Sequence, residues 1–291
     1  MTGADPSRRA PSRRALIGGL VLGGAVVGAA GIGAALELGG SAKPGAAPGA
    51  GDGAAPGAAG SVQPFAPTFP ASGLVTNEYA YREPNSPQAH NSDDWIVTSG
   101  SLFAQDGDGW TGVPDSGETG TDSAKYNDSA VFRLVTRRRD FGSVRAAATV
   151  KVERPITTKR TPASEWDGAH FWLRYHSPSE LYALSFRRRD GMVVIKRKVT
   201  AHDKAAVDGG DYTTLAQVSH PIPYDSWQQV AASAVNGSGG TVRLTLEING
   251  QTALSVVDTA PGALVAPGGV GLRVDNSELW FRDFTATPLG G

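Results

Sequence analysis

Beyond residue 68, apolar and polar positions alternate with a period of two over stretches of five to eight residues. This alternation is typical of half-buried β-strands, and helical periodicity is nearly absent. The pattern predicts strands at 129–136, 144–152, 169–176, 181–187, 193–196, 242–248 and 279–284.

Short turns separate these predicted strands and fit antiparallel neighbours. Asp190-Gly191 and Asn249-Gly250 are two-residue hairpin signals, and Ser177-Pro178-Ser179 lies between two further predicted strands. Many strands with short turns predict an all-β fold, a two-sheet antiparallel β-sandwich of the jelly-roll type. Trp227 begins another predicted strand, where we expect it to be a core anchor.

The first 42 residues have a composition of their own. Residues 1–14 carry four arginines against one aspartate, and residues 15–36 are apolar and rich in glycine and alanine. A positive segment before an apolar run is an export pattern, and residues 12–17 resemble the twin-arginine motif, with Gly18 in place of the usual lysine. We expect 1–42 to be a twin-arginine-like signal peptide. An uncleaved membrane anchor is the alternative, because the apolar run is long enough to span a bilayer.

Residues 43–67 are almost entirely alanine, glycine and proline. Such a segment buries too little apolar surface to fold, so it is expected to be a disordered linker. Residues 68–291 are then expected to form one β-sandwich domain. The protein is expected to be secreted, or anchored to the outer face of the cytoplasmic membrane if the signal is retained.

Charge and cysteine content exclude several classes of function. From residue 68 onward there are 22 Lys and Arg against 25 Asp and Glu, so no overall positive field favours nucleic acid as a partner. The chain has no cysteine, which excludes disulfides, thiolate zinc sites and thiol catalysis. Packing must stabilise the domain, and a structural calcium ion with oxygen ligands is one further means.

Four segments in a fixed order carry a family resemblance. They are 99–104, 168–175, 223–230, and a last group that combines 244–250 with 269–273 and 281–284. This order resembles the concanavalin A-like lectin/glucanase superfamily, including laminin-G-like domains. The resemblance implies two stacked antiparallel sheets, one of them curved, whose concave face often holds a glycan. Lectins, adhesion modules, glycosidases and lyases share this fold, so the fold alone does not select the function.

The strand at 169–176 carries the most informative side chains. If Ala169, Phe171, Leu173 and Tyr175 face the core, then His170, Trp172, Arg174 and His176 face outward together, where an aromatic plane and polar groups suit a sugar. Further candidate ligand-binding residues are Tyr182, Arg187, Lys196 and, at one end of the groove, Trp110. Between Arg154 and Lys198 there are ten basic residues and four acidic ones, which suits an acidic polysaccharide. The alternative is that Trp172 belongs to the core and the basic residues are solvated.

Acidic residues suggest a calcium site, with solvation as the simpler interpretation. Six of them surround Trp110 in a glycine-rich segment: Asp106, Asp108, Asp115, Glu118, Asp122 and Asp128. The spacing and the final glutamate of an EF-hand are missing. The family resemblance implies a different arrangement, in which calcium links an early acid to the aspartate of the closing strand. Glu78 and Asp283 occupy the matching positions.

Known catalytic motifs of related enzymes are missing. The sequence has neither the Glu-x-Asp-x-(x)-Glu strand of retaining glucanases nor the Gln-x-His and Tyr-Lys-x-Gly-x-Tyr strands of jelly-roll lyases. It also lacks a Ser-His-Asp order, a P-loop and a dinucleotide fingerprint. His170 with Tyr182 and Arg174 forms a hypothetical lyase set, in which the arginine neutralises a uronate carboxylate and His or Tyr removes the C5 proton.

The sequence therefore predicts an exported carbohydrate-binding module, with a polysaccharide or cell-wall glycan as its partner. A polysaccharide hydrolase or lyase using the same face is one alternative. A cell-surface protein-interaction domain of the laminin-G type is another. Neither the sugar nor the oligomeric state follows from the sequence.

Overall fold

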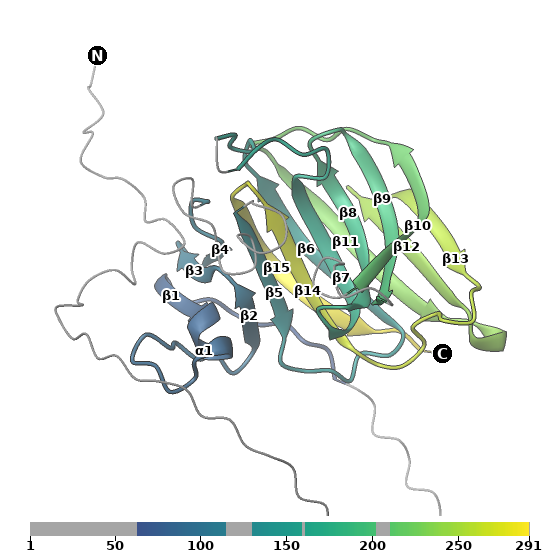
Figure 1. Ribbon diagram of the computed structural model, residues 1–291, viewed down its shortest axis with the longest axis horizontal. Coiled ribbons are helices and arrows are strands. Elements are labelled where there is room, and N and C mark those ends of the chain that lie inside the picture. Colours follow the sequence, from purple (N-terminus) through teal and green to yellow (C-terminus); the bar gives the residue numbers. More distant parts are fainter. Residues whose placement is uncertain (1–62, 115–129, 159–160, 202–209, 291) are drawn as a thin grey trace, which may run out of the picture. The chain divides into compact units, whose positions relative to one another are not determined.

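The computed structural model describes residues 63–114, 130–158, 161–201 and 210–290. This part of the chain forms two antiparallel sheets, of eight and seven strands, and includes a short helix, α1 (Glu78–Arg82) (Figure 1). The predicted two-sheet antiparallel sandwich is confirmed. Within the described ranges, the structure contains no helix of the length and apolarity that crossing a membrane requires. The predicted signal lies outside the described residues.

The seven-stranded sheet has the order β10-β9-β8-β7-β14-β5-β2. Its strands are, along the chain, β2 (Trp95–Ser99), β5 (Val131–Thr136), β7 (Gly168–Ser177), β8 (Glu180–Arg188), β9 (Met192–Thr200), β10 (Gly210–Ser219) and β14 (Gly269–Asp275). The strands from β7 to β10 are neighbours in both sequence and space. The predicted turn at Asp190-Gly191 joins β8 to β9, with Gly191 at a φ of 74°.

The eight-stranded sheet has the order β1-β3-β4-β15-β6-β11-β12-β13. Its strands are β1 (Ser72–Asn77), β3 (Ser101–Gln105), β4 (Asp108–Trp110), β6 (Val144–Val152), β11 (Trp227–Asn236), β12 (Val242–Ile248), β13 (Gln251–Asp258) and β15 (Leu279–Pro288). Asn249 and Gly250 join β12 to β13 with φ angles of 51° and 77°. Two consecutive positive φ angles are what a tight hairpin turn of this length requires, so the predicted turn is confirmed.

The core lies between the sheets and extends into the segment expected to be a linker. Phe65 is 6% exposed and packs edge-on against Trp95 and Phe284, with ring centroids 5.3 and 6.3 Å apart. Its backbone exchanges two hydrogen bonds with Ala286 of β15. Phe65 is therefore part of the packed domain, because its ring fills the core as a strand residue would.

The stretch 99–104, one of the segments that carry the family resemblance, is divided between the two sheets. Ser99 ends β2 in the seven-stranded sheet and Ser101 begins β3 in the eight-stranded sheet. Gly100 lies between them at a φ of 85°, a conformation that glycine adopts without strain. Its amide N–H donates to Glu78 Oε2 at 3.3 Å, which ties α1 to this crossing.

Candidate functional site

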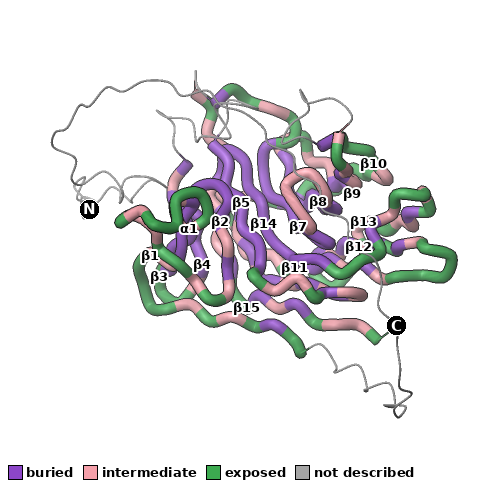
Figure 2. Tube along the Cα trace, turned by 60° about the horizontal axis from the view of Figure 1, so that its bottom comes forward, coloured by how far each residue is buried: buried purple, intermediate pink, exposed green. Residues whose placement is uncertain are grey.

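A cavity of about 240 Å³ opens on the outer face of the seven-stranded sheet. We call this the seven-strand cavity. Residues from strands β7, β8, β9, β10 and β14, and from the loop before β7, line it: Trp166, His170, Trp172, Ala183, Ser185, Arg188, Lys196, Tyr212, Arg273 and Asp275. Central strands β5, β14 and β7 are buried along most of their length, whereas β10 is largely exposed (Figure 2). The cavity thus combines a buried floor with an exposed edge.

Strand pairing brings the polar residues of the floor into one row. His170 lies opposite Arg273 on one side and opposite Ser185 on the other. The Ser185 Oγ is 2.7 Å from His170 Nδ1, and His170 Nε2 is 3.4 Å from Asp275 Oδ2. Arg273 donates two hydrogen bonds to the Asp275 carboxylate, each 2.8 Å long. The floor is therefore a connected polar network in which each member fixes the next.

The charge states of this network follow from its contacts. Burial alone would raise the pKa of Asp275, but the Arg273 charge and the hydrogen bonds from His170 and Arg273 outweigh it and hold that pKa below its usual range. Burial lowers the pKa of His170, and the Asp275 carboxylate only partly offsets this. Burial also lowers the pKa of Lys196, as do the charges of Arg188 and Arg273. Near pH 7 the floor therefore holds an ionised aspartate beside a neutral imidazole.

Aromatic side chains form the walls and the rim. Trp172 is 3% exposed and stacks on Tyr175, with ring centroids 5.4 Å apart and planes 19° apart. Its indole N–H has no acceptor among the residues that the structure describes. Trp166 and Tyr212 are 48% and 37% exposed. Two accessible aromatic planes therefore flank an entrance with a polar floor.

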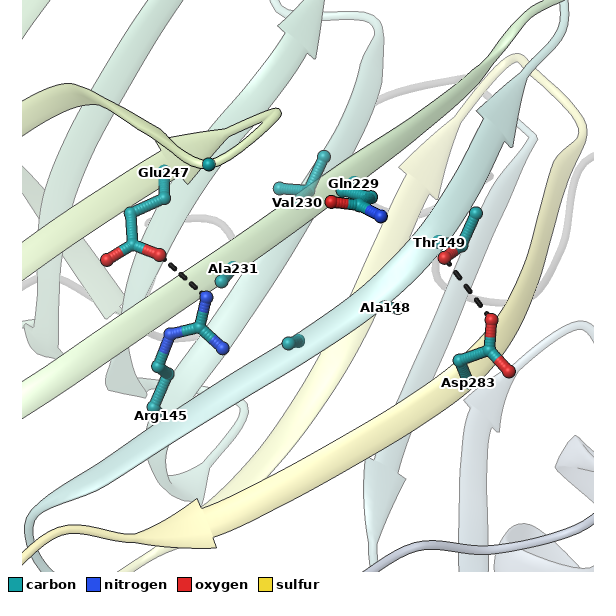
Figure 3. Close-up of a pocket in the computed structure, with 10 residues that line it drawn as sticks. Arg145, Ala148, Thr149, Gln229, Val230, Ala231, Glu247 and Asp283 are labelled. Atoms are coloured by element: carbon teal, nitrogen blue, oxygen red, sulfur yellow. Dashed lines mark hydrogen bonds and ion pairs between the residues drawn. The ribbon is translucent and has the colours of Figure 1, made fainter.

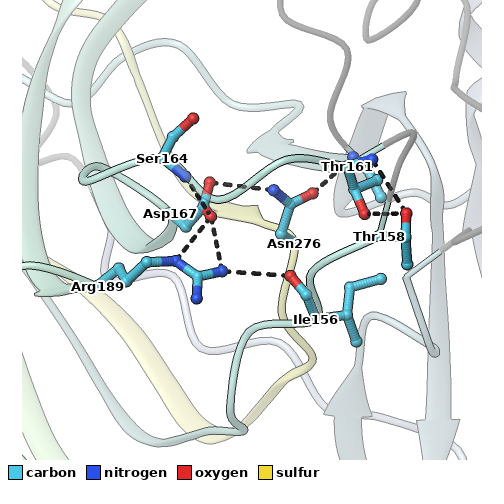
Figure 4. A network of polar contacts seen from close by, with 8 residues as sticks. Ile156, Thr158, Thr161, Ser164, Asp167, Arg189 and Asn276 are labelled. Carbon is cyan, nitrogen blue, oxygen red and sulfur yellow. Dashed lines mark hydrogen bonds and ion pairs between the residues drawn. The ribbon is translucent and has the colours of Figure 1, made fainter.

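A buried network fixes the loop that carries Trp166 (Figure 4). Asp167 is fully buried; its carboxylate accepts hydrogen bonds from Arg189 at 2.9 Å, Asn276 Nδ2 at 3.1 Å and the Ser164 N–H at 3.0 Å. Burial raises the pKa of Asp167 despite these donors. Since Asn276 directly follows Asp275, the rim of the cavity is fastened to the same strand end as its floor.

Three predicted ligand-binding residues, His170, Trp172 and Lys196, do meet in the cavity. Arg174 does not, because the backbone at Arg174 has a φ of 51° and the pairing of β7 with β8 shifts register after Leu173. Such a bulge moves the following residue to the other face. Tyr175 therefore takes the outward position.

Arg174 instead points between the sheets and is fully buried. Its guanidinium donates to the Asn236 side chain at 2.7 Å and to the carbonyls of Val265 and Ala266 at 3.3 and 3.1 Å. Burial lowers the pKa of Arg174 to about 10. The predicted outward position of Arg174 is thus wrong, and this side chain ties β7 to the facing sheet.

A second bulge displaces Arg187. The pairing of β7 with β8 shifts between Ala169 and His170, and Arg188 rather than Arg187 lines the cavity. The Arg187 guanidinium lies 3.4 Å from the centroid of the Tyr224 ring. This stacking removes Arg187 from the predicted binding set.

Tyr182 and Trp110 also lie away from the cavity. Tyr182 is fully buried between the sheets and donates to Asp258 Oδ2 at 2.7 Å. The hypothetical lyase set of His170, Tyr182 and Arg174 is therefore not assembled. Trp110 belongs to the eight-stranded sheet, where it stacks on Trp280 at 5.0 Å and donates to Glu278 at 2.8 Å.

The structure places the two predicted calcium ligands on different elements, and each has a hydrogen-bond donor within the protein. Glu78 lies in α1 and accepts from Gly100, whereas Asp283 lies in β15 and accepts from Thr149 Oγ1 at 3.3 Å. Asp106 and Gly107 form the turn between β3 and β4, with φ angles of 54° and 82°. Asp115, Glu118, Asp122 and Asp128 lie outside the described residues. Within the described ranges, no group of three or more His, Cys, Asp and Glu side chains is placed to hold a metal ion.

The outer face of the eight-stranded sheet carries a second hollow, of about 190 Å³ (Figure 3). We call it the eight-strand groove. Small residues such as Ala147, Ala148 and Ala231 line part of it. Arg145 forms a 2.6 Å ion pair with Glu247 at one end, and Thr149 binds Asp283 at the other. Trp227, expected in the core, is half-buried on this sheet, where Arg282 packs 4.4 Å from its ring centroid.

Several residues of the seven-strand cavity were not predicted as site residues: Trp166, Ser185, Arg188, Tyr212, Arg273 and Asp275. Trp166 is in a loop, where strand alternation gives no signal. Ser185 does follow from alternation, since it shares a face with His170 once the hairpin pairing is known. Arg273 and Asp275 alternate in β14 but are joined to β7 only by the long-range sheet order.

Comparison with known proteins gives fold similarity only. The sequence matches no known protein family and no curated protein. A carbohydrate-binding module, CBM66 from Bacillus subtilis, has 10% identity and a TM-score of 0.44, over 66% of this chain and 95% of that one. The lumenal domain of VIP36, in its Ca²⁺/Man3GlcNAc-bound form, has 12% identity and a TM-score of 0.42, over 68% and 84%.

A third solved structure with a similar fold is an enzyme. The alginate lyase Aly36B, a mutant in complex with an alginate trisaccharide, has 12% identity and a TM-score of 0.43, over 78% of this chain and 98% of that one. The sandwich itself is established by the strand pairing described above.

Proposed function

We propose that this protein is a glycan-binding module that takes an acidic polysaccharide in the seven-strand cavity. The observation that carries the proposal is the joint lining of one cavity by exposed aromatic planes and by cationic side chains. Concave sites with convergent polar groups are where ligands bind by default. Solved structures with a similar fold include a carbohydrate-binding module and a lumenal domain in a Ca²⁺/Man3GlcNAc-bound form, which accords with the proposal.

The aromatic residues supply the surface for the sugar rings. Trp166 and Tyr212 expose 48% and 37% of their surface, and both line the same cavity. The apolar face of a pyranose packs on an aromatic plane, while its hydroxyls bond to polar neighbours. Asp167 and Asn276 already hold the loop of Trp166 in place, so little conformational entropy would be lost at the rim when a sugar binds.

The cationic residues favour an acidic sugar. Arg188 is engaged by Asp190, and Arg273 by Asp275. Lys196 forms an ion pair with none of the residues that the structure describes; its ammonium lies 5.7 Å from the centroid of the Tyr212 ring. The charges of Arg188 and Arg273 disfavour its protonated form, so an incoming carboxylate would relieve that repulsion.

Titration calorimetry of the full chain with polygalacturonate and alginate, and with a neutral glucan of similar length, tests the proposal. Wild-type protein should bind at least one polyuronate and bind it less tightly as salt rises. Trp166→Ala and Lys196→Gln should each weaken binding by about tenfold, equivalent to about 1.4 kcal/mol.

Two control variants share the chemistry of these substitutions but lie elsewhere. Tyr81→Ala removes an aromatic side chain that is 49% exposed on α1, and Arg243→Gln removes one positive charge from an exposed position of β12. Both should retain wild-type affinity. Equal losses in controls and cavity variants, or no binding of any polyuronate, would rule out the proposal.

We also propose that the domain works outside the cytoplasm, on the basis of the signal-like segment 1–42. Fractionation of cells that express the full chain tests this, with Arg13→Lys/Arg14→Lys as the variant that should block twin-arginine export. Unchanged export of that variant would contradict a twin-arginine signal, and retention of wild-type protein in the cytoplasm would contradict export.

A further inference from the structure

One part of the seven-strand cavity has no role in the proposed glycan binding. Ser185, His170 and Asp275 form a chain of contacts across three adjacent strands, β8, β7 and β14. The contact distances are 2.7 Å from Ser185 Oγ to His170 Nδ1 and 3.4 Å from His170 Nε2 to Asp275 Oδ2. All three residues line the cavity, and they are 3%, 7% and 0% exposed.

The direction of the hydrogen bonds follows from the carboxylate. Asp275 is ionised and only accepts, so the neutral imidazole of His170 carries its proton on Nε2. His170 Nδ1 is then left as an acceptor, and the Ser185 hydroxyl must donate to it. A hydroxyl that donates to an oriented imidazole is the arrangement that activates a serine nucleophile.

We propose that Ser185 is the nucleophile of an esterase centre, with His170 as its general base and Asp275 as the residue that positions His170. The substrate class is a carboxylic ester with a small acyl group, because the cavity measures about 240 Å³. That this ester is an acyl group on a hydroxyl of the bound polysaccharide rests on the proposed function.

The reaction balances with water as the only co-reactant. Ser185 Oγ attacks the ester carbonyl carbon and its proton passes to His170 Nδ1. As the tetrahedral intermediate collapses, the bond to the sugar oxygen breaks and His170 returns the proton to that oxygen. Water then attacks the acyl-serine and gives its proton to His170; the carboxylic acid leaves, and Ser185 Oγ regains a proton.

Lys196 is placed to stabilise the charge that develops on the carbonyl oxygen. Ser185 pairs with Val194 of β9, and Lys196 is the next residue on the same face of that strand. Such diagonal neighbours lie about 7–8 Å apart, within reach of a long side chain. Lys196 lines the same cavity, and the backbone amides beside Ser185 are engaged in strand pairing, so the Lys196 side chain is a cation in reach of the oxyanion.

Covalent labelling of the full-length wild-type protein is the primary test. A fluorophosphonate probe should modify Ser185, identified by mass spectrometry of the digested protein. Hydrolysis of p-nitrophenyl acetate should fall by about 100-fold or more in kcat/KM in Ser185→Ala and His170→Asn. Ser233→Ala, on β11 of the other sheet, should be labelled and active like wild type.

Asp275→Asn should lower kcat with little change in KM, and it should shift the pH profile, because the imidazole loses its orienting partner. The esterase proposal is overturned if Ser185 carries no adduct or if Ser185→Ala hydrolyses the ester at the wild-type rate. Since p-nitrophenyl acetate contains no sugar, this test is independent of glycan binding. If the protein binds polyuronate but does not hydrolyse p-nitrophenyl acetate, only the esterase proposal is contradicted. If Ser185 is labelled but no polyuronate binds, only the proposed glycan-binding function is contradicted.

Discussion

The outer faces of the two sheets both carry a hollow, but their charged side chains differ in how far they are buried. In the eight-strand groove, charges are paired near solvent, as in the ion pair of Arg145 with Glu247, whose side chains are 43% and 31% exposed. In the seven-strand cavity, the carboxylate of Asp275 is fully buried and holds both Arg273 and His170.

In the eight-strand groove, water can solvate the charged groups. In the seven-strand cavity, other side chains of the protein must take the place of that water. Exposed ion pairs contribute little and cost little. Burying a charge is expensive unless its partners are in place, so a buried network is weak evidence for stability in itself. The chain maintains such a network under a cavity with exposed aromatic rims, which is typical of preorganised functional sites.

Asp275→Ala should produce the largest effect. Removing this carboxylate leaves Arg273 and His170 buried without their partner, and breaking a buried ion pair costs about 3–5 kcal/mol. Urea denaturation should show the loss in the free energy of unfolding. Asp211→Ala, at an exposed position of β10, should leave that free energy within about 0.5 kcal/mol of wild type. A comparable loss in both variants would show that the buried carboxylate is no more important for stability than an exposed one.

Tyr182→Phe should reduce stability but not affect ligand binding. The hydroxyl donates to Asp258 and accepts from the Leu264 N–H at 2.9 Å, so its removal leaves buried polar groups with fewer partners, at a cost of about 1–3 kcal/mol. Thermal unfolding measures that loss. A change in polyuronate affinity would show that Tyr182 reaches the ligand, as alternation along the strand predicts.

The stability of the wild-type protein should decrease on acidification because of His170. Asp275 and Arg273 face it from β14, and Ser185 and Arg188 from β8. Above an ordinary histidine pKa of about 6.5, both the folded and unfolded states are neutral and His170 contributes nothing. Below it, the unfolded state binds a proton that the folded state resists, so stability falls by at most about 1.4 kcal/mol per pH unit.

His170→Asn should remove this contribution. Between pH 7 and pH 5, the free energy of unfolding should fall less steeply in the variant than in wild type. Parallel pH curves for the two proteins would show that the folded state does not resist protonation at His170.

Glu247→Ala should have the smallest effect, about 0–1 kcal/mol, because it breaks only a partly exposed pair. A loss as large as that of Asp275→Ala would remove the distinction between the two faces. Urea denaturation under identical conditions allows the two variants to be compared directly.

The sequence was sufficient for the fold and for part of the site. Alternation and turn residues predicted the sandwich and the turns at Asp190-Gly191 and Asn249-Gly250, because these signals are local. They gave no sign of the sheet change at Gly100, which lies between Ser99 of β2 and Ser101 of β3. They also failed at Arg174 and Arg187, because a bulge reverses the facing of the residues beside it and depends on the partner strand.

The remaining site residues could not be predicted for a different reason. Asp275 reaches His170 only because β14 inserts between β5 and β7, and nothing near residue 275 in the sequence encodes that neighbour. Trp166 depends on a loop conformation that long-range hydrogen bonds to Asp167 fix. These contacts depend on the order of the strands in the sheet, and a period-two pattern along the chain does not reveal that order.

The hydrogen bonds that join Asn276 to Ile156 and Asp167 have a consequence for protein engineering. Asn276 has a φ of 55° and accepts at its backbone oxygen from the Ile156 N–H at 2.8 Å, while its side chain donates to Asp167. The segment between Ile156 and Asp167, which carries Trp166, is thus fastened at both ends to one residue of the scaffold. A segment of other composition grafted between these two anchor points would change the rim at Trp166 as a cassette, while the floor residues His170, Ser185 and Asp275 on strands β7, β8 and β14 would stay in place.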